Sequence, residues 1–518
     1  MLAWLKALPD KVFPDRPVLS VAYAHVLLAS GEIEGVAERL RDAERWLDTP
    51  AAMRERPNSP TDAVVVVDDQ AFRRLPGTIA IARAGLALAA GDVAGTMMYA
   101  RRALDLAPRD DHLTRGGAAG FLGLAAWTSG DLDAAYQTYA AGMANLQKAG
   151  NISDAINGAL TLGAIRVAQG RLRQAMRIYE QGLRLATDGG GPVLRGAADM
   201  HVGMSEIHRE HNDLQAATQH LLKSRELGEH TGFRQNRYRW HVAMARVRAA
   251  QGDPDSALDR LDEAERLYMS DFSPNVRPIA ALKARVWLAQ GRVGDALDWV
   301  REQGVSAHDD LDYLREFEHI TLARILLAQH RSDGADDAVG ETVGLLERLR
   351  RAAEAGARMG SVIEILALQA LALQMQGNTS AALVALERAL RLAAPEGYVR
   401  LFVDEGRPMA DLLRQVSRLK VAGFGQYVNS LLDALRGGAD APTAPAAHRH
   451  SSTLVEPLSE RERDVLRLLA TDLSGPDMAR ELMVSLNTVR THIKSIYGKL
   501  GVSNRRAAVR RAEDLGFL

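Results

Sequence analysis

The feature that most restricts the fold is an internal repeat in positions 1–436. Glycine or asparagine recurs after Ala/Leu-rich runs, and from Gly91 to Gly291 the step between successive turns is nearly constant. Each unit is predicted to be a helix pair, because glycine and asparagine adopt the left-handed conformation that ends a helix. A single pair cannot bury its apolar face, so neighbouring pairs should stack into a solenoid. The predicted turns are Gly31-Glu32, Gly91-Asp92, Gly130-Asp131, Gly170-Arg171, Asn212-Asp213, Gly252-Asp253, Gly291-Arg292 and Gly377-Asn378.

Two longer steps interrupt this period. The step from Gly31 to Gly91 is half as long again as the regular one, and we expect an insertion within residues 50–67. The step from Gly291 to Gly377 spans two periods, which predicts a degenerate turn near Gln329-His330. About eight to ten units are expected in all. Tetratricopeptide units are roughly 34 residues long, and the units here are longer, so the array resembles that class without matching its length.

Composition agrees with an all-α fold. Ala and Leu dominate and Arg is abundant, and these residues lose little on entering a helix. The chain contains no cysteine, so disulfides and thiolate metal sites are excluded. No apolar run reaches the roughly 18 residues of a membrane-spanning helix, so a soluble, cytoplasmic protein without membrane contact is expected. No nucleophile triad or carboxylate pair is recognisable, and we expect neither enzyme activity nor a cofactor or metal.

Residues 437–453 are rich in Ala, Pro, Gly and Ser, which is typical of a flexible linker. They separate the predicted repeat domain, residues 1–436, from a small module, residues 454–518. The net charge of the whole chain is −1, but residues 486–511 contain seven basic residues and no acidic one. Such a block is typical of a surface that meets phosphates.

Four short helices are predicted in this module, beginning near Ser459, Ser474, Ser485 and Ser503, each of which can accept a hydrogen bond from the first helical turn. This order predicts a helix-turn-helix DNA-binding domain of four helices. In the third helix the apolar positions are expected to face the core. They are Val489, Ile493, Ile496 and Leu500.

The opposite face of the third helix suits the major groove of DNA. Arg490 and Lys494 can donate to guanine O6 and N7, and Thr491 is small enough for close approach to a base. A solvated basic face on an ordinary helix is the alternative, but two capped helices in the right order precede this one. Residues near the helix ends are predicted to contact phosphates. They are Asn487, Thr488, Lys499 and Arg505.

The module resembles the LuxR/GerE-type DNA-binding domain. It departs from the family pattern at Asp472, where the family usually has Gly, and at Met478, where it usually has Ile. The matching positions are Leu458, Arg461, Glu462, Val465, Leu466, Ala479, Leu482, Ser485, Thr488, Val489, His492, Ile496, Tyr497, Lys499, Leu500 and Arg505.

The resemblance implies that Arg490, Thr491 and Lys494 contact bases of double-stranded DNA. It also implies that two modules pair through the fourth helix and bind an inverted-repeat operator as a homodimer. The pairing residues would be Ala508, Ala512 and Leu515.

The array resembles the sensor region of large ATP-binding LuxR-type regulators of the maltose-operon-activator kind. The resemblance depends on Trp4-Leu-Lys-Ala-Leu-Pro, Arg16-Pro, Ala389-Leu and residues 397–406. Those regulators carry an ATPase before the array, whereas the G-x-x-x-x-G-K-[ST] motif does not occur in these 518 residues. A fragment, a misplaced start and a regulator that works without nucleotide remain open.

Two side-chain groups in the array have competing interpretations. Four histidines, His201, His208, His211 and His220, could seat a metal, but a solvated or polar helix face is the favoured interpretation. Trp127, Trp240, Trp287 and Trp299 could stack on a ligand ring, but packing between repeats is favoured. A metal-dependent enzyme would depend on the histidines alone.

The main hypothesis is a bacterial transcription regulator in which a small-molecule or protein effector in the repeat groove controls the DNA-binding module. RNA polymerase is a candidate further partner. The alternative is a protein-interaction scaffold whose C-terminal module serves mainly for docking.

Overall fold

The computed structural model describes residues 1–47, 64–187, 191–269, 272–333, 336–418, 424–439, 460–469, 475–482 and 484–500, and residues 471, 473, 502, 505, 508, 509 and 512 singly. Over these residues it contains helices and no strand. The chain divides into two compact units, residues 1–441 and 442–518. None of the described helices is long and apolar enough to cross a membrane.

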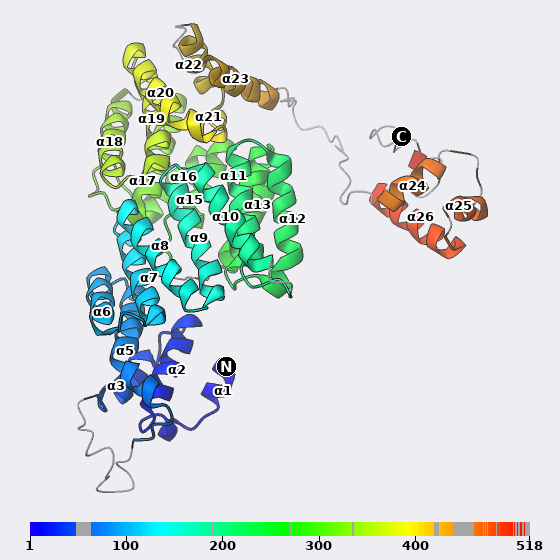
Figure 1. Cartoon of the computed structure of the whole chain (residues 1–518). Coiled ribbons are helices and arrows are strands. Elements are labelled where there is room, and N and C mark those ends of the chain that lie inside the picture. The colour runs from blue at the N-terminus through cyan, green and yellow to red at the C-terminus, as the bar shows by residue number, and fades with distance from the viewer. Residues whose placement is uncertain are drawn as a thin grey trace. The chain divides into compact units, whose positions relative to one another are not determined.

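The first unit is an array of antiparallel helix pairs, shown from blue to yellow in Figure 1. Short helices precede it: α1 (Leu2–Lys6) and the 3₁₀ helix η1 (Asp10–Val12). The nine described pairs are α2 (Pro17–Ala29) with α3 (Val36–Glu44), α5 (Asp69–Ala89) with α6 (Val93–Leu106), α7 (His112–Thr128) with α8 (Leu132–Lys148), α9 (Ile152–Ala168) with α10 (Leu172–Thr187), α11 (Ala197–Glu210) with α12 (Leu214–Thr231), α13 (Asn236–Ala250) with α14 (Pro254–Arg266), α15 (Ile279–Ala289) with α16 (Val293–Gln303), α17 (Glu316–Asp333) with α18 (Asp336–Ala355), and α19 (Met359–Met375) with α20 (Thr379–Ala393).

Further short elements complete the array, and three helices are described in the second unit. The array adds η2 (Tyr313–Arg315), η3 (Ala394–Glu396), α21 (Arg400–Val403), α22 (Gly406–Arg418) and α23 (Gly425–Ala439). The second unit contains α24 (Glu460–Leu469), α25 (Gly475–Glu481) and α26 (Leu486–Leu500).

All eight predicted turns are confirmed. Each of their glycines or asparagines has a φ between 63° and 81°, and each joins the two helices of a pair. In five of them the next residue then starts the second helix, because its side chain accepts a hydrogen bond from the backbone N–H three positions on. These residues are Asp92, Asp131, Asp213, Asp253 and Asn378.

The predicted turn at Gln329-His330 is wrong. Both residues lie inside α17, which continues to Asp333 before α18 begins at Asp336. Neither side chain favours the left-handed conformation, so nothing in this dipeptide ends the helix. Of the predicted insertion within residues 50–67, residues 50–63 lie outside the described residues. α23 extends to Ala439, three residues into the predicted linker, and the remainder of that linker, residues 440–453, also lies outside them.

Aromatic rings of the second helices pack against glycines of the first helices. The Tyr179 ring is buried between α9 and α11, where a Cβ built at Gly163 or at Gly203 would lie 2.3 or 2.6 Å from it. One repeat earlier the helices approach even more directly, because a Cβ built at Gly123 would lie 2.7 Å from the Cβ of Tyr139 and 2.9 Å from its backbone nitrogen. Glycine at these positions lets two helices approach until the ring fills the space between them.

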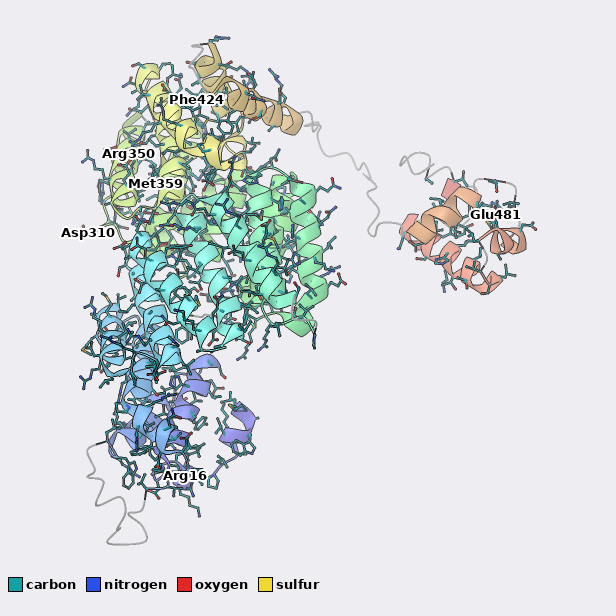
Figure 2. The ribbon with its side chains drawn as sticks, in the orientation of Figure 1. Arg16, Asp310, Arg350, Met359, Phe424 and Glu481 are labelled. Atoms are coloured by element: carbon teal, nitrogen blue, oxygen red, sulfur yellow. The ribbon has the colours of Figure 1, made fainter. Side chains whose placement is uncertain are left out.

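The array also makes contacts between units that are far apart in sequence. Arg358 donates from Nη1 to the carbonyl of Gly130 at 3.1 Å and pairs through Nε with buried Glu316 at 2.8 Å. Met359 opens α19 (Figure 2), and its Cβ would lie 3.3 Å from a Cβ built at Gly170. The turns at Gly130 and Gly170 therefore lie against the start of α19.

A further set of long-range contacts joins α11 to α21. The N–H of Val399 donates to the carbonyl of Glu210 at 3.0 Å, and that of Leu401 donates to the Glu210 carboxylate at 2.8 Å. The Arg209 guanidinium pairs with Glu210 and with Asp404. An ideal solenoid has contacts between adjacent repeats only. Here α11 also contacts a segment that follows α20, so contacts between distant repeats add to those between neighbours.

Gly163→Ala is predicted to lower the free energy of unfolding by about 1–3 kcal/mol, because the new methyl group overlaps the Tyr179 ring, which Gly203 blocks on its other side. Gly344→Ala is the matched control. Gly344 is an exposed glycine inside α18 with nothing within 4 Å of a built Cβ, so alanine should stabilise by about 0.5–1 kcal/mol. Urea unfolding midpoints of the two variants, each compared with that of the wild-type chain, measure these changes. Equal shifts in the same direction would contradict the packing described here.

Candidate nucleic-acid interface and array cavity

The three described helices of the second unit pack around one small core. α24 and α25 both contact α26, which contributes Val489 and Ile496 to the core with no exposed surface. Ile493 packs against this core while half-buried, and the side chain of Leu500 lies outside the described residues. The predicted apolar face of the third helix is therefore confirmed at its three described positions.

α26 begins at the predicted cap. The Ser485 hydroxyl accepts a hydrogen bond from the N–H of Thr488 at 3.1 Å, and its own carbonyl accepts from Val489. Because α25 ends at Glu481, only four residues separate the two helices. This short connection is the order of elements that a helix-turn-helix domain requires.

The predicted DNA-contacting residues on α26 fall into two groups. The side chains of Thr488, Thr491 and Lys494 are exposed, away from the core residues Val489 and Ile496. Asn487 and Arg490 also belong to α26, but their side chains lie outside the described residues.

Lys499 is placed differently from the prediction. Its Nζ lies 2.8 Å from Oε2 of Glu462, and both side chains are largely buried, with exposed fractions of 18% and 6%. Ser495 donates to the other oxygen of the same carboxylate at 2.6 Å. A lysine engaged by a buried carboxylate is not free for a phosphate, so Lys499 joins α26 to α24 instead.

Arg505 is also a correction. Its guanidinium donates to the carbonyls of Leu469 at 2.9 Å and Leu473 at 2.7 Å, and also to those of Leu468 and Thr471. The last carbonyls of a helix have no partner within it. Arg505 supplies those partners at the end of α24, so its side chain holds the module together instead of facing a phosphate.

Two of the three predicted pairing residues of the fourth helix, Ala508 and Ala512, are not on the surface. The described residues Arg505, Ala508, Val509 and Ala512 are helical, but Ala508 and Ala512 have no exposed surface and belong to the core around Val465. Their methyl groups cannot contact a second module while this core is intact. Leu515 lies outside the described residues.

The histidine group is spread over two environments. Nδ1 of His201 lies 2.9 Å from Nδ1 of His220, and the His208 ring stacks on the His220 ring at 5.1 Å. His211 instead bonds through Nε2 to the carbonyl of Glu396 at 3.0 Å. Burial, with the charge of His220, lowers the pKa of His201 to about 4. Within the described part of the chain, no group of three such side chains has the arrangement of a metal site.

The tryptophans pack in the cores of the array. Trp127, Trp240 and Trp299 are buried, and Trp287 packs partly buried beside Trp299. None of the four lines the large cavity of the array. The favoured interpretation, packing between repeats, is confirmed for the three buried rings.

A cavity of about 1470 Å³ lies within the array. Side chains from α11, α13, α15, α17, α19, α21 and α22 line it, so the contacts between α11 and α21 help to enclose it. Its wall carries an ion-pair network in which Glu364 accepts from Arg285 at 2.7 Å and from Arg324 at 2.9 Å. Burial opposes ionisation of Glu364, but these two cations lower its pKa to about 2. The sequence pattern does not predict this cavity, because its residues come from helices that are far apart in the chain.

Two family models match the chain. Residues 77–419 match the MalT-like TPR region, and residues 456–512 match the bacterial regulatory proteins of the luxR family. The chain belongs to the LuxR-type regulators with a MalT-like repeat region. It is therefore a DNA-binding regulator, and both matching families are regulatory or repeat families.

One solved structure supports the helical-repeat fold of the array in this LuxR-type regulator. A Rap protein complexed with competence and sporulation factor has a TM-score of 0.50 and 10% identity, over 73% of this chain and 98% of that one. The apo form of the quorum sensor NprR from B. thuringiensis has 12% identity over 75% and 90% of the two chains. Its TM-score of 0.33 supports no inference. The similarity to the Rap protein concerns only the helical-repeat fold of the array.

Arg505→Gln is predicted to destabilise the C-terminal module of this regulator by about 2–3 kcal/mol, because buried carbonyls at the end of α24 lose a charged donor. Hydrogen–deuterium exchange of the α24 and α26 amides in the full chain measures the loss. Lys494→Gln, at an exposed position on α26, is the control and should leave exchange unchanged. Unchanged protection in Arg505→Gln would contradict the assigned role.

Proposed function

We propose that this protein is a transcription regulator in which an effector or partner bound in the cavity of the array controls sequence-specific DNA binding by the C-terminal module. The observation that carries the DNA-binding part is the surface of α26. That helix is anchored through Val489 and Ile496, exposes Thr491 and Lys494, and contains no acidic residue. A helix with these two faces fits the major groove.

Within this proposal α26 contacts the base edges. Arg490 and Lys494 donate to guanine, and Thr491 approaches a neighbouring base. Asn487 and Thr488 lie in the first turn of α26, where backbone N–H groups and short polar side chains are suited to phosphates. Lys499 and Arg505 are omitted from the phosphate contacts, since both are engaged inside the module.

The operator is proposed to be an inverted repeat bound by two copies of the chain. Two-fold symmetric binding requires a module surface that pairs with itself. Ala508 and Ala512 are omitted from that surface because they are buried. RNA polymerase remains a proposed further partner in the cytoplasm.

The effector part of the proposal is supported by the half-open cavity of the array. The cavity exceeds the roughly 300–1,000 Å³ that is usual for small-ligand pockets, so it can hold a small molecule or a short segment of a partner. The helices that surround it come from distant repeats, and a bound ligand would contact several of them at once. Such contacts let a ligand favour one curvature of the array over another.

Arg490→Ala is predicted to weaken binding to a selected operator by about 1–3 kcal/mol and to relax base preference at one position. Binding of the full chain to the operator and to random duplex, measured over a range of salt concentrations, checks this. Because one cation is lost, the slope of log binding constant against log salt concentration on random duplex should become shallower by about one or less.

Lys148→Ala is the control for net charge, since Lys148 lies at the exposed end of α8 in the array. It should leave both affinities unchanged. If Arg490→Ala weakened operator and random duplex equally, or if the full chain selected no DNA sequence at all, the assignment of α26 as the base-contacting helix would fail.

A further inference from the structure

The cavity of the array holds more positive charge than its carboxylates balance. Ten arginines and six carboxylate residues line it. Every one of the six carboxylates already forms an ion pair with an arginine, as Glu206 does with Arg246 and Glu405 with Arg324. The remaining guanidinium charge is therefore available to a ligand.

Arg277 is the clearest case. It lies two residues before α15, its side chain is exposed, and it lines the cavity. Among the described residues, no hydrogen bond or ion pair engages its guanidinium group, which lies 5.9 Å from the centre of the Phe317 ring. Arg285 lies 3.8 Å from the same ring, and its buried Nη2 has no hydrogen-bond partner.

Arg246, on α13, completes a group of like charges. Burial, together with the charges of Arg277 and Arg285, lowers the pKa of Arg246 to about 9. Burial also lowers the pKa of Arg285 to about 10, with Arg324 and Arg277 contributing. Glu206 pairs with Arg246 and Glu364 pairs with Arg285, whereas no described carboxylate pairs with Arg277. Three guanidinium groups therefore face two carboxylates, and one positive charge of the group is left for a ligand.

We propose that the ligand of this cavity is an organic anion whose carboxylate or phosphate group binds between Arg246, Arg277 and Arg285. The inference rests on the proposed role of the cavity as the effector site. Guanidinium groups match both anions with paired hydrogen bonds. Phe317 and the aliphatic side chains of α15 lie beside them, so the ligand carries an apolar body next to its charged group.

Arg277→Gln is the test variant, because it removes one cation without breaking any described ion pair and should leave the array folded. Isothermal titration of the full chain with citrate and, separately, with pyrophosphate measures anion binding, at constant ionic strength set with NaCl. Trehalose is the neutral probe. The wild-type chain is expected to bind at least one of the two anions saturably. The Arg277→Gln variant is expected to bind that anion about tenfold more weakly. Saturable binding of citrate alone indicates that the anionic group of the ligand is a carboxylate, and saturable binding of pyrophosphate alone indicates a phosphate.

Two control variants separate the cavity from other cationic surfaces. Arg225→Gln removes an exposed arginine of α12 outside the cavity, and Lys494→Gln removes an exposed cation of the DNA-contacting helix. Both should retain wild-type anion affinity. The proposal is overturned if Arg277→Gln binds the anions as tightly as wild type, if Lys494→Gln loses the binding, or if neither anion binds saturably.

The same titrations distinguish this inference from the proposed function. Anion binding that needs Arg277 but leaves operator affinity unchanged would contradict effector control while supporting an anion site. Operator affinity that responds to trehalose equally in wild type and Arg277→Gln would support effector control and contradict the anionic ligand.

Discussion

The array depends on the junction at Glu210, where the end of α11 meets the segment that leads into α21. The Glu210 carbonyl and carboxylate accept the N–H groups of Val399 and Leu401, and the neighbouring Arg209 pairs with Asp404. Burial of these charges carries a desolvation penalty, which the paired geometry offsets. The junction joins α11 to a segment that follows α20, and residues from both line the half-open cavity of the array.

Contacts between distant repeats give the array a cavity lined by charged residues, which a stack with neighbour contacts alone would lack. A helix pair presents its polar residues to solvent, and the arginines of α13, α15 and α17 would be ordinary surface charges in an open stack. Once the array curves, the same residues face one another across a confined volume, where like charges interact more strongly than in water. The lowered pKa values of Arg246 and Arg285 follow first from burial and then from the neighbouring guanidinium charges.

Local features could be predicted from the sequence, and distant contacts could not. Gly130 and Asn212 end helices for a reason contained in their own backbone preference, and Ser485 caps α26 through a residue three positions away. The close packing of Tyr179 between Gly163 and Gly203 was missed, although these two glycines stand one repeat apart in the sequence. The contact of Glu210 with Leu401 has no sequence signal, because it depends on the summed curvature of the repeats.

The C-terminal module shows the same limit. Helical periodicity correctly placed Val489 and Ile496 in the core and Thr491 and Lys494 outside. It could not show that Lys499 meets Glu462, or that Arg505 meets the end of α24, since both contacts join different helices. The basic residues of this domain therefore fall into two groups. Lys499 and Arg505 hold its helices together, whereas Lys494 faces outward.

The junction at Glu210 holds one wall of the cavity in place. Hydrogen–deuterium exchange of the Val399 and Leu401 amides in the full chain tests it most directly. A formed junction predicts exchange as slow as in the buried helix α19, with the protection of both amides reduced in Glu210→Ala. Exchange at the rate of an exposed loop in the wild-type chain would show that the junction is not formed, and the cavity wall that it holds would then have no support.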